Sequence, residues 1–138
     1  MSSENKNMDD FDWVKALSSC SLSIVFERLR QDVENDVKTR NELRVKDLRA
    51  DGFGYEFSFT GGSYSFKVIL DSNQKREVVT FKLGDKSISA TDSQGDLLFD
   101  ATLTLNDEGE CRLKIEGEEH DLWHVRRMAL EHIFFGIY

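Results

Sequence analysis

The sequence predicts an α+β protein in two layers, with an N-terminal amphipathic helix, a six-stranded antiparallel meander sheet and a C-terminal helix. Apolar residues recur at helical spacing near both ends of the chain. Between these ends they alternate with polar residues in short segments separated by turn-forming residues. A sheet with one apolar and one mostly polar face is typical of antiparallel strands, and both helices are expected to cover the apolar face.

The first long element is predicted at residues 21–40, where the apolar residues fall within an arc of about 120° on a helical wheel. They are Leu22, Val25, Phe26, Leu29, Val33 and Val37. Ser21 is a suitable N-cap for this helix. A shorter helical turn is expected at residues 9–17, beginning near Asp9 or Asp10. Its buried side would carry Phe11, Val14 and Leu17.

Residues 53–70 predict a hairpin of two aromatic-rich strands around the pair Gly61 and Gly62. A two-residue type I′ turn, which requires positive φ at both positions, would set the register of this hairpin. The apolar face would then pair Phe53 with Leu70, Tyr55 with Val68, Phe57 with Phe66, and Phe59 with Tyr64. The opposite face would pair Glu56 with Lys67 and Ser58 with Ser65. Every pair in this register matches in chemistry.

Four further strands complete the predicted sheet, at residues 78–83, 86–91, 97–105 and 111–117. A two-residue turn at Gly84 and Asp85 would join the first two of these strands. The resulting pairs would be Phe81 with Ile88 and Val79 with Ala90. The last two strands would turn eight side chains toward the helices, namely Leu97, Phe99, Ala101, Leu103, Leu105, Cys111, Leu113 and Ile115.

The C-terminal helix is predicted to begin after Asp121, a good N-cap, and to stop at Gly136. Its core-facing arc consists of Leu122, Val125, Ala129 and Ile133. A second apolar stripe, of Trp123, Leu130 and Phe134, lies about 100 to 120° from the first and cannot face the same sheet. If the sheet curled until it closed, this order of strands and helix would resemble a pleckstrin-homology-like barrel, which has seven strands.

The chain is expected to form one domain, residues 1–138, with residues 1–8 disordered. It contains no apolar run of about 18 residues, so no membrane segment is predicted. The N-terminus lacks the apolar region of a signal peptide. Cys20 and Cys111 are too few and too far apart to predict a disulfide framework. We therefore expect a protein of the reducing cytoplasm.

The charge distribution narrows the range of partners. The formal net charge is −8, and residues 51–138 hold nine Lys and Arg against sixteen Asp and Glu. Nucleic-acid binding requires a basic surface, so nucleic acid is not expected as a partner. A basic protein partner fits this charge.

No catalytic, metal or cofactor site is predicted. His120, His124 and Glu131 could share one helix face as a two-His-one-carboxylate set, but Arg127 lies in the same stripe and would repel a cation. No serine lies in a GxSxG or SxxK motif. Cys111 alternates with core residues and is interpreted as a small apolar side chain. We therefore expect a non-enzymatic protein.

The predicted function is the binding of another protein, as an adaptor, inhibitor, immunity protein or secretion chaperone. Large apolar groups left outside a core often mark a partner or self-association site. The predicted contact residues are Trp123, Leu130, Phe134 and Tyr138, with Glu118 and Glu119 of the acidic region 106–121 steering a basic partner. A homodimer is a further alternative. The stripe could instead be buried by the helix at 21–40.

The alternative function is a carrier of a small hydrophobic ligand on the aromatic face of the sheet. The ligand would contact Tyr55, Phe57, Tyr64 and Phe66. The two tyrosine hydroxyls are the polar groups that such a pocket would offer. The same rings also fit a sheet core that fills the space where the helices diverge. The core interpretation is favoured, because few polar groups converge there.

Overall fold

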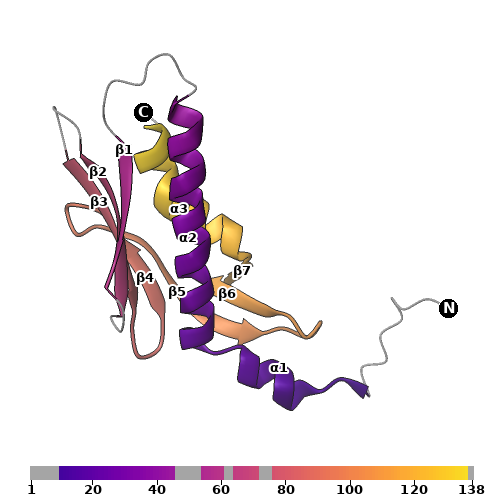
Figure 1. Ribbon diagram of the computed structural model, residues 1–138. Coiled ribbons are helices and arrows are strands. Elements are labelled where there is room, and N and C mark those ends of the chain that lie inside the picture. Colours follow the sequence, from indigo (N-terminus) through magenta and orange to yellow (C-terminus); the bar gives the residue numbers. More distant parts are fainter. Residues whose placement is uncertain (1–9, 46–53, 61–63, 72–75, 137–138) are drawn as a thin grey trace.

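Figure 1 shows the computed structural model, which describes residues 10–45, 54–60, 64–71 and 76–136. The predicted disorder of residues 1–8 lies outside these ranges. The helices are α1 (Trp13–Ser19), α2 (Leu22–Val45) and α3 (Leu122–Phe135). The strands are β1 (Gly54–Phe59), β2 (Ser65–Asp71), β3 (Arg76–Leu83), β4 (Ile88–Thr91), β5 (Leu97–Leu105), β6 (Cys111–Ile115) and β7 (Glu118–His120).

The strands form one open antiparallel sheet in which each strand pairs only with its neighbours in sequence, from β1 at one edge to β7 at the other. Helices α2 and α3 both pack on one face of this sheet (Figure 1). The predicted two-layer α+β fold is therefore confirmed, and the sheet does not close into a barrel. None of the helices in the described part of the chain is long and apolar enough to cross a membrane.

The prediction of six strands was wrong by one, because a short hairpin follows β6. Glu116 and Gly117 have φ of 49° and 85°. Positive φ at both positions is what a type I′ turn requires, and Ile115 pairs with Glu118 across the turn. The strand after the turn is only three residues long and carries no apolar side chain, so alternation could not reveal it.

The registers of two predicted hairpins were wrong by two residues each. Phe59 pairs with Phe66 in the β1–β2 hairpin, and Phe81 pairs with Ala90 in the β3–β4 hairpin. The β3–β4 turn lies one residue later than predicted, at Asp85 and Lys86, since Gly84 N donates to Ser87 O at 2.8 Å. A shift of two residues leaves every side chain on its predicted face. The glycine pair between β1 and β2 lies outside the described residues.

The new register also replaces the predicted polar pairs, since Glu56 pairs with Ile69 and Ser58 pairs with Lys67. Tyr64 was predicted to point inward, but it is 70% exposed. It precedes the first residue of β2, so it lies beyond the end of the β1–β2 ladder.

A β-bulge changes which side chains of β5 face the core. Ala90 pairs with Phe99 but Thr91 pairs with Leu97, so Leu98 is the extra residue. Leu97 is consequently 60% exposed, against the prediction, whereas Leu98 packs against the core.

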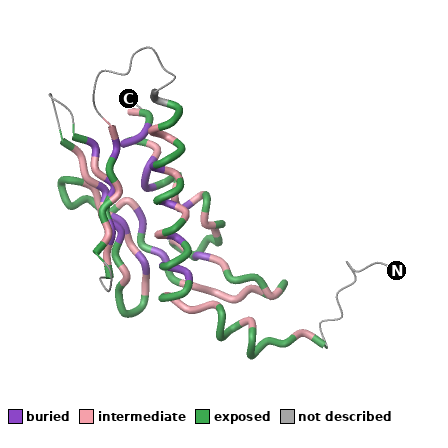
Figure 2. Tube along the Cα trace, in the orientation of Figure 1, coloured by how far each residue is buried: buried purple, intermediate pink, exposed green. Residues whose placement is uncertain are grey.

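The core lies between the two helices and the sheet, as the buried segments in Figure 2 show. The buried residues of α2 are Val25, Phe26, Leu29, Val33 and Val37, all in the predicted stripe. A row of rings runs across the sheet through Phe66, which stacks on Phe81 with centroids 4.6 Å apart and also contacts Phe57.

At the edge of this row, the Arg30 guanidinium lies over the Phe59 ring at 4.5 Å. The hydrogen bonds that Arg30 donates to Glu27 lower the pKa of the Glu27 carboxyl.

Both ends of α3 were predicted correctly, but the start of α1 was not. Helix α3 begins after Asp121 and ends before Gly136, whose φ of 57° is the left-handed conformation common at helix C-termini. Helix α1 begins after Asp12 rather than near Asp9 or Asp10, because the Asp12 side chain accepts from Lys15 N at 3.0 Å. The prediction that α1 has a buried side was wrong, since no side chain of α1 is buried.

Candidate functional site

Two side-chain contacts show the relative direction of α2 and α3. Arg126 Nε donates to Asp36 Oδ2 at 2.7 Å, and Arg40 Nε donates to the Phe134 carbonyl at 2.9 Å. Residue numbers increase together along both helices at these contacts, so α2 and α3 run in the same direction. The two helices therefore form the two sides of a shared surface.

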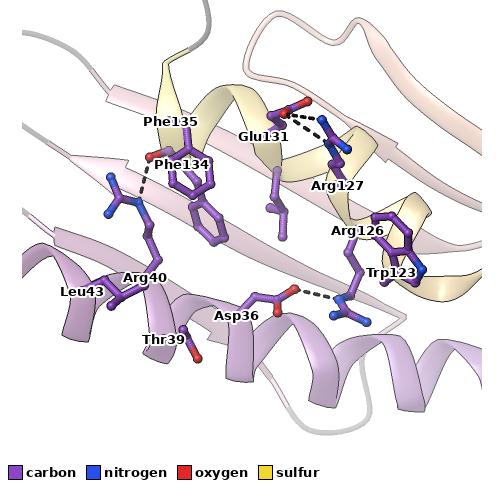
Figure 3. A pocket seen from close by; sticks show the side chains of 11 residues that line it. Asp36, Thr39, Arg40, Leu43, Trp123, Arg126, Arg127, Glu131, Phe134 and Phe135 are labelled. Atoms are coloured by element: carbon purple, nitrogen blue, oxygen red, sulfur yellow. Dashed lines mark hydrogen bonds and ion pairs between the residues drawn. The ribbon is translucent and has the colours of Figure 1, made fainter.

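A groove of about 330 Å³ opens between α2 and α3 (Figure 3), and we call it the α2–α3 groove. It is lined by Asp36, Thr39, Arg40, Leu43, Trp123, Arg126, Arg127, Leu130, Glu131, Phe134 and Phe135. Leu130 and Phe134 are buried, whereas Leu43, Trp123 and Phe135 are 54%, 49% and 61% exposed. The groove thus combines a buried apolar base with large apolar side chains that reach solvent.

Four of the five charged side chains that line the groove form ion pairs, and the fifth, Arg40, donates to the Phe134 carbonyl. Arg126 contacts both Asp36 and Asp32, the latter at 3.3 Å. Arg127 contacts Glu131 one turn further along α3, at 3.1 Å. Since these cations already have carboxylate partners, the apolar side chains are what the groove offers a ligand.

The carboxyl end of α3 is held by two donors from different elements. The Phe134 carbonyl accepts from Arg40 Nε and also from Tyr55 Oη, the latter at 3.0 Å. The Arg40 guanidinium lies 4.7 Å from the centre of the Phe135 ring. Asn41 in turn ties α2 to the edge strand β1, because its side-chain amide bonds both the N–H and the carbonyl of Tyr55. These contacts fix the end of the groove at which Phe135 is exposed.

The predicted partner-binding residues are partly brought together. Trp123, Leu130 and Phe134 all line the α2–α3 groove. Glu118 and Glu119 are exposed on β7, which leads directly into α3 at its Trp123 end. Helix α2 covers Leu130 and Phe134, as the alternative interpretation expected, but it leaves Trp123 half exposed. Tyr138 lies outside the described residues.

Sequence reasoning missed the last turn of α2 and with it the contribution of Leu43 to the groove. The helix was predicted to end at residue 40, whereas it continues to Val45 and so presents Leu43. The pairing of Arg126 with Asp36 joins residues 90 positions apart and has no local signal.

The predicted carrier residues do not line either of the two described cavities. Tyr55 is buried, with its hydroxyl bonded to Phe134, and Phe66 packs tightly against Phe26, Phe57 and Phe81. The second cavity, of about 560 Å³, lies between β3 and α3 and involves neither ring. Tyr55 and Phe66 therefore belong to the core, which is the interpretation that the sequence favoured, whereas Tyr64 is exposed.

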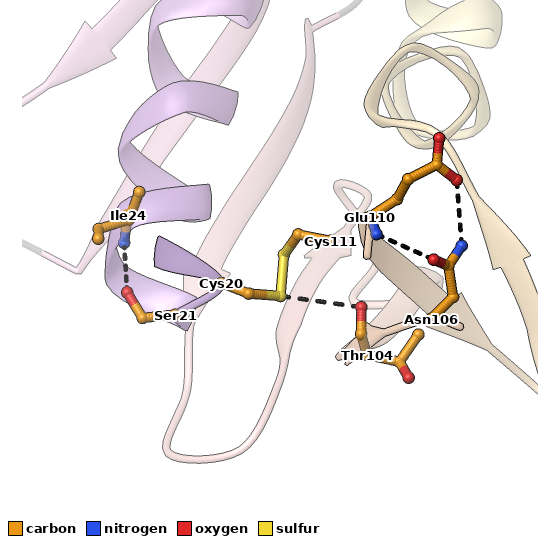
Figure 4. The surroundings of a disulfide bond; sticks show 7 residues. All are labelled: Cys20, Ser21, Ile24, Thr104, Asn106, Glu110 and Cys111. Carbon is orange, nitrogen blue, oxygen red and sulfur yellow. Dashed lines mark hydrogen bonds between the residues drawn. A yellow bond between two sulfur atoms is a disulfide. The ribbon is translucent and has the colours of Figure 1, made fainter. Parts of the chain in front are cut away.

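Figure 4 shows that Cys20 and Cys111 form a disulfide. The spacing of the two cysteines did not predict this bond, and Cys111 is exposed rather than a small core residue. The bond joins the turn between α1 and α2 to the first residue of β6, across 91 residues of sequence. The folding of the sheet brings these distant positions together, so their spacing in sequence carried no signal.

His120 and His124, which were considered as metal ligands, lie close together without a third ligand among the described residues. The rings of His120 and His124 have centroids 6.1 Å apart, and His124 also stacks on Trp123 at 3.8 Å. Among the described residues, no group of three or more His, Cys, Asp or Glu could hold a metal ion.

Comparison with family models, with curated proteins and with solved structures found no significant match to this chain. The fold alone does not indicate a function, since one fold can host many unrelated functions. A function must therefore be argued from the geometry of the sites themselves.

Proposed function

We propose that the chain is a protein-binding module that takes an apolar segment of a partner protein into the α2–α3 groove. The observation that carries this proposal is the exposure of Trp123, Phe135 and Leu43 around the buried Leu130 and Phe134. Aromatic residues are enriched at protein interfaces, and binding energy concentrates where such anchors meet a pocket. Adaptors, inhibitors, immunity proteins and secretion chaperones are classes that act by such binding without catalysis.

The geometry of the groove favours a helical partner segment. It runs along two helices that point in the same direction, and its apolar residues succeed one another from Trp123 to Phe135 over about 18 Å of helix. An amphipathic helix laid in such a groove would contact it with one apolar face. Glu118 and Glu119 lie beyond the Trp123 end and would favour a basic extension of this helix. Pairing of two copies through the same groove is the homodimeric form of this proposal.

The redox state of Cys20 and Cys111 bears on the cellular compartment of the protein. The predicted cytoplasmic location assumed reduced thiols, but disulfides persist mainly in oxidising compartments. Rapid alkylation of thiols in intact cells, followed by mass spectrometry of Cys20 and Cys111, measures their state directly. Alkylated cysteines would support the cytoplasm, and a recovered disulfide would contradict it.

Site-specific photo-crosslinking in the native host tests the groove. A benzoyl-phenylalanine at Trp123 should give a discrete crosslinked product, and the mass of that product distinguishes a foreign partner from a second copy. Tyr64, which is 70% exposed and far from the groove lining, is the matched control position. Identical products from both positions, or no product from Trp123, would sink the proposal.

The contribution of charge can be separated from that of the groove. Glu118→Lys combined with Glu119→Lys should lower the crosslinking yield from Trp123 if the partner is basic. Asp85→Lys combined with Asp100→Lys, at exposed positions of the β3–β4 turn and of β5, makes the same change of net charge and is the control. An equal fall in crosslinking yield in the test and control variants would show that Glu118 and Glu119 do not belong to the proposed site.

A further inference from the structure

Helix α1 presents an apolar face that nothing in the described part of the chain covers. Trp13, Val14 and Leu17 are 62%, 55% and 49% exposed. Leu17 lies four residues after Trp13 and three after Val14, so the three side chains share one side of the helix. Exposed large apolar groups that are contiguous commonly mark an interaction surface.

The position of α1 is fixed by the β5–β6 hairpin at both of its ends. Before the helix, the Phe11 ring packs on Gly109, and its Cζ lies only 2.6 Å from where a Cβ on that glycine would be. Gly109 has a φ of 78° in the hairpin turn, so the position favours glycine on two grounds. After the helix, Cys20 is bonded to Cys111 and its Sγ lies 3.8 Å from the Thr104 carbonyl (Figure 4).

The surroundings of this apolar face are acidic. Residues 10–20 and 104–112 together contain five Asp and Glu against two Lys and Arg, a net charge of −3. The acids are Asp10, Asp12, Asp107, Glu108 and Glu110, and all five are exposed. Of the two cations, Arg112 is engaged by Glu110 and Asp121, at 3.6 and 3.4 Å. The hairpin to which α1 is attached thus carries exposed negative charge.

We propose that α1 and the β5–β6 hairpin form a second docking surface, which binds a basic amphipathic helix of a partner protein. The apolar face of that helix would cover Trp13, Val14 and Leu17. Its Lys and Arg side chains would face the acids of the hairpin, which is the complementarity that steers charged partners together. We call this the α1 surface.

The charge argues against a second copy of this chain as the occupant. Two α1 surfaces brought together would place both acidic hairpins at one interface, where like charges oppose association. The α1 surface is also separate from the α2–α3 groove. Leu22, where α2 begins next to α1, and Asp36, the first groove residue, are about 21 Å apart along the helix. Each surface can therefore be tested without the other.

Binding of a model peptide to the full chain tests the α1 surface. The Trp123→Phe variant leaves Trp13 as the sole tryptophan, so its fluorescence reports on α1 directly. The probe is a synthetic amphipathic peptide of leucine and lysine about 18 residues long, and a leucine–glutamate peptide of the same pattern is its counterpart. We expect the lysine peptide to shift the Trp13 emission to the blue and the glutamate peptide to leave it unchanged.

Matched variants make the result specific to the surface. Leu17→Asp should weaken binding of the lysine peptide by about tenfold or more, as expected for an apolar contact at the centre of an interface. Leu97→Asp introduces the same change at another exposed leucine, 60% accessible on β5, and should leave the affinity unchanged. Asp107→Lys with Glu108→Lys should weaken binding, most strongly at low salt, and by more than Asp85→Lys with Asp100→Lys, which makes the same change of net charge at exposed positions outside this surface.

Three results would overturn the proposal. One is equal affinity of the Leu17→Asp and Leu97→Asp variants for the lysine peptide, which would mean that the apolar face of α1 does not contact it. Another is equal binding of the glutamate peptide. The third is a Trp13 emission that is already blue-shifted in the free chain, or a dimer in sedimentation that Leu17→Asp dissociates, because either would show that the chain itself occupies this face.

Discussion

Helices α1 and α2 are separated by only two residues, yet different forces hold them in place. Helix α2 is anchored by an apolar stripe that packs on the sheet, in which Leu29 and Val33 have no exposed surface. Helix α1 has no buried side chain and is attached at its ends, through Phe11 on Gly109 and through the disulfide of Cys20. The chain thus uses burial where two layers face each other, and a covalent bond where α1 has no second layer to bury against.

The two kinds of attachment have comparable energies. Full burial of one large apolar side chain contributes about 1.5–3 kcal/mol. A disulfide that closes a loop of about 100 residues contributes up to about 4.7 kcal/mol in the chain-entropy description. Cys20 and Cys111 are 91 residues apart, so their bond corresponds to the burial of about two core side chains.

The largest effect is expected from breaking the core. Phe81→Ala removes a side chain with no exposed surface that stacks on Phe66, so it should lower the free energy of unfolding by about 3–5 kcal/mol. Urea denaturation followed by circular dichroism measures this loss. Tyr64→Ala, at an exposed aromatic position, is the control. A loss below about 1 kcal/mol for Phe81→Ala would mean that the row of rings is not the main core.

A smaller effect is expected from removing the covalent attachment. Cys20→Ser combined with Cys111→Ser should lower the free energy of unfolding by about 2–4 kcal/mol, because the unfolded chain regains the freedom of a 91-residue loop. Hydrogen exchange should show faster exchange at residues 13–19, while the buried segment of α2 stays protected. Equal stability of the oxidised and reduced wild-type chain would refute this account of the disulfide.

The smallest effect is expected from the exposed face of α1. Trp13→Ala should change the free energy of unfolding by less than about 0.5 kcal/mol, because 62% of the side chain already faces solvent. Thermal denaturation of this variant beside the wild-type chain gives the difference. A loss above about 1 kcal/mol would show that α1 is held by packing, and it would remove the contrast between the two helices.

Periodicity in the sequence was enough to predict the layers of the fold but not the register of the strands. Alternation assigns a side chain to a face, and a shift of two residues leaves that assignment unchanged. Phe57 and Phe66 were therefore correctly placed on one face although they are not directly paired. The position of the turn determined the true pairs, since the β3–β4 turn centres on Asp85 and Lys86, one residue after the predicted pair of Gly84 and Asp85.

The candidate surfaces depend on contacts between distant parts of the chain. Trp123 was recognised as surplus to the core from its angle on the helical wheel, but the extension of α2 to Leu43 on the other side of the groove was not. The exposure of α1 was also missed, since Phe11, Val14 and Leu17 have the spacing of a buried stripe. Spacing shows that three side chains share a face, but it does not show whether another layer covers that face.

The order of the strands has a consequence for how the chain folds. Because every strand pairs with the next one in sequence, the sheet can grow hairpin by hairpin, through contacts that close short loops. Packing of α3 beside α2 instead joins Asp36 with Arg126, 90 residues apart. We expect this docking to be among the last steps of folding. The α2–α3 groove would then exist only on completed molecules, and a partner that binds it would distinguish finished chains from folding intermediates.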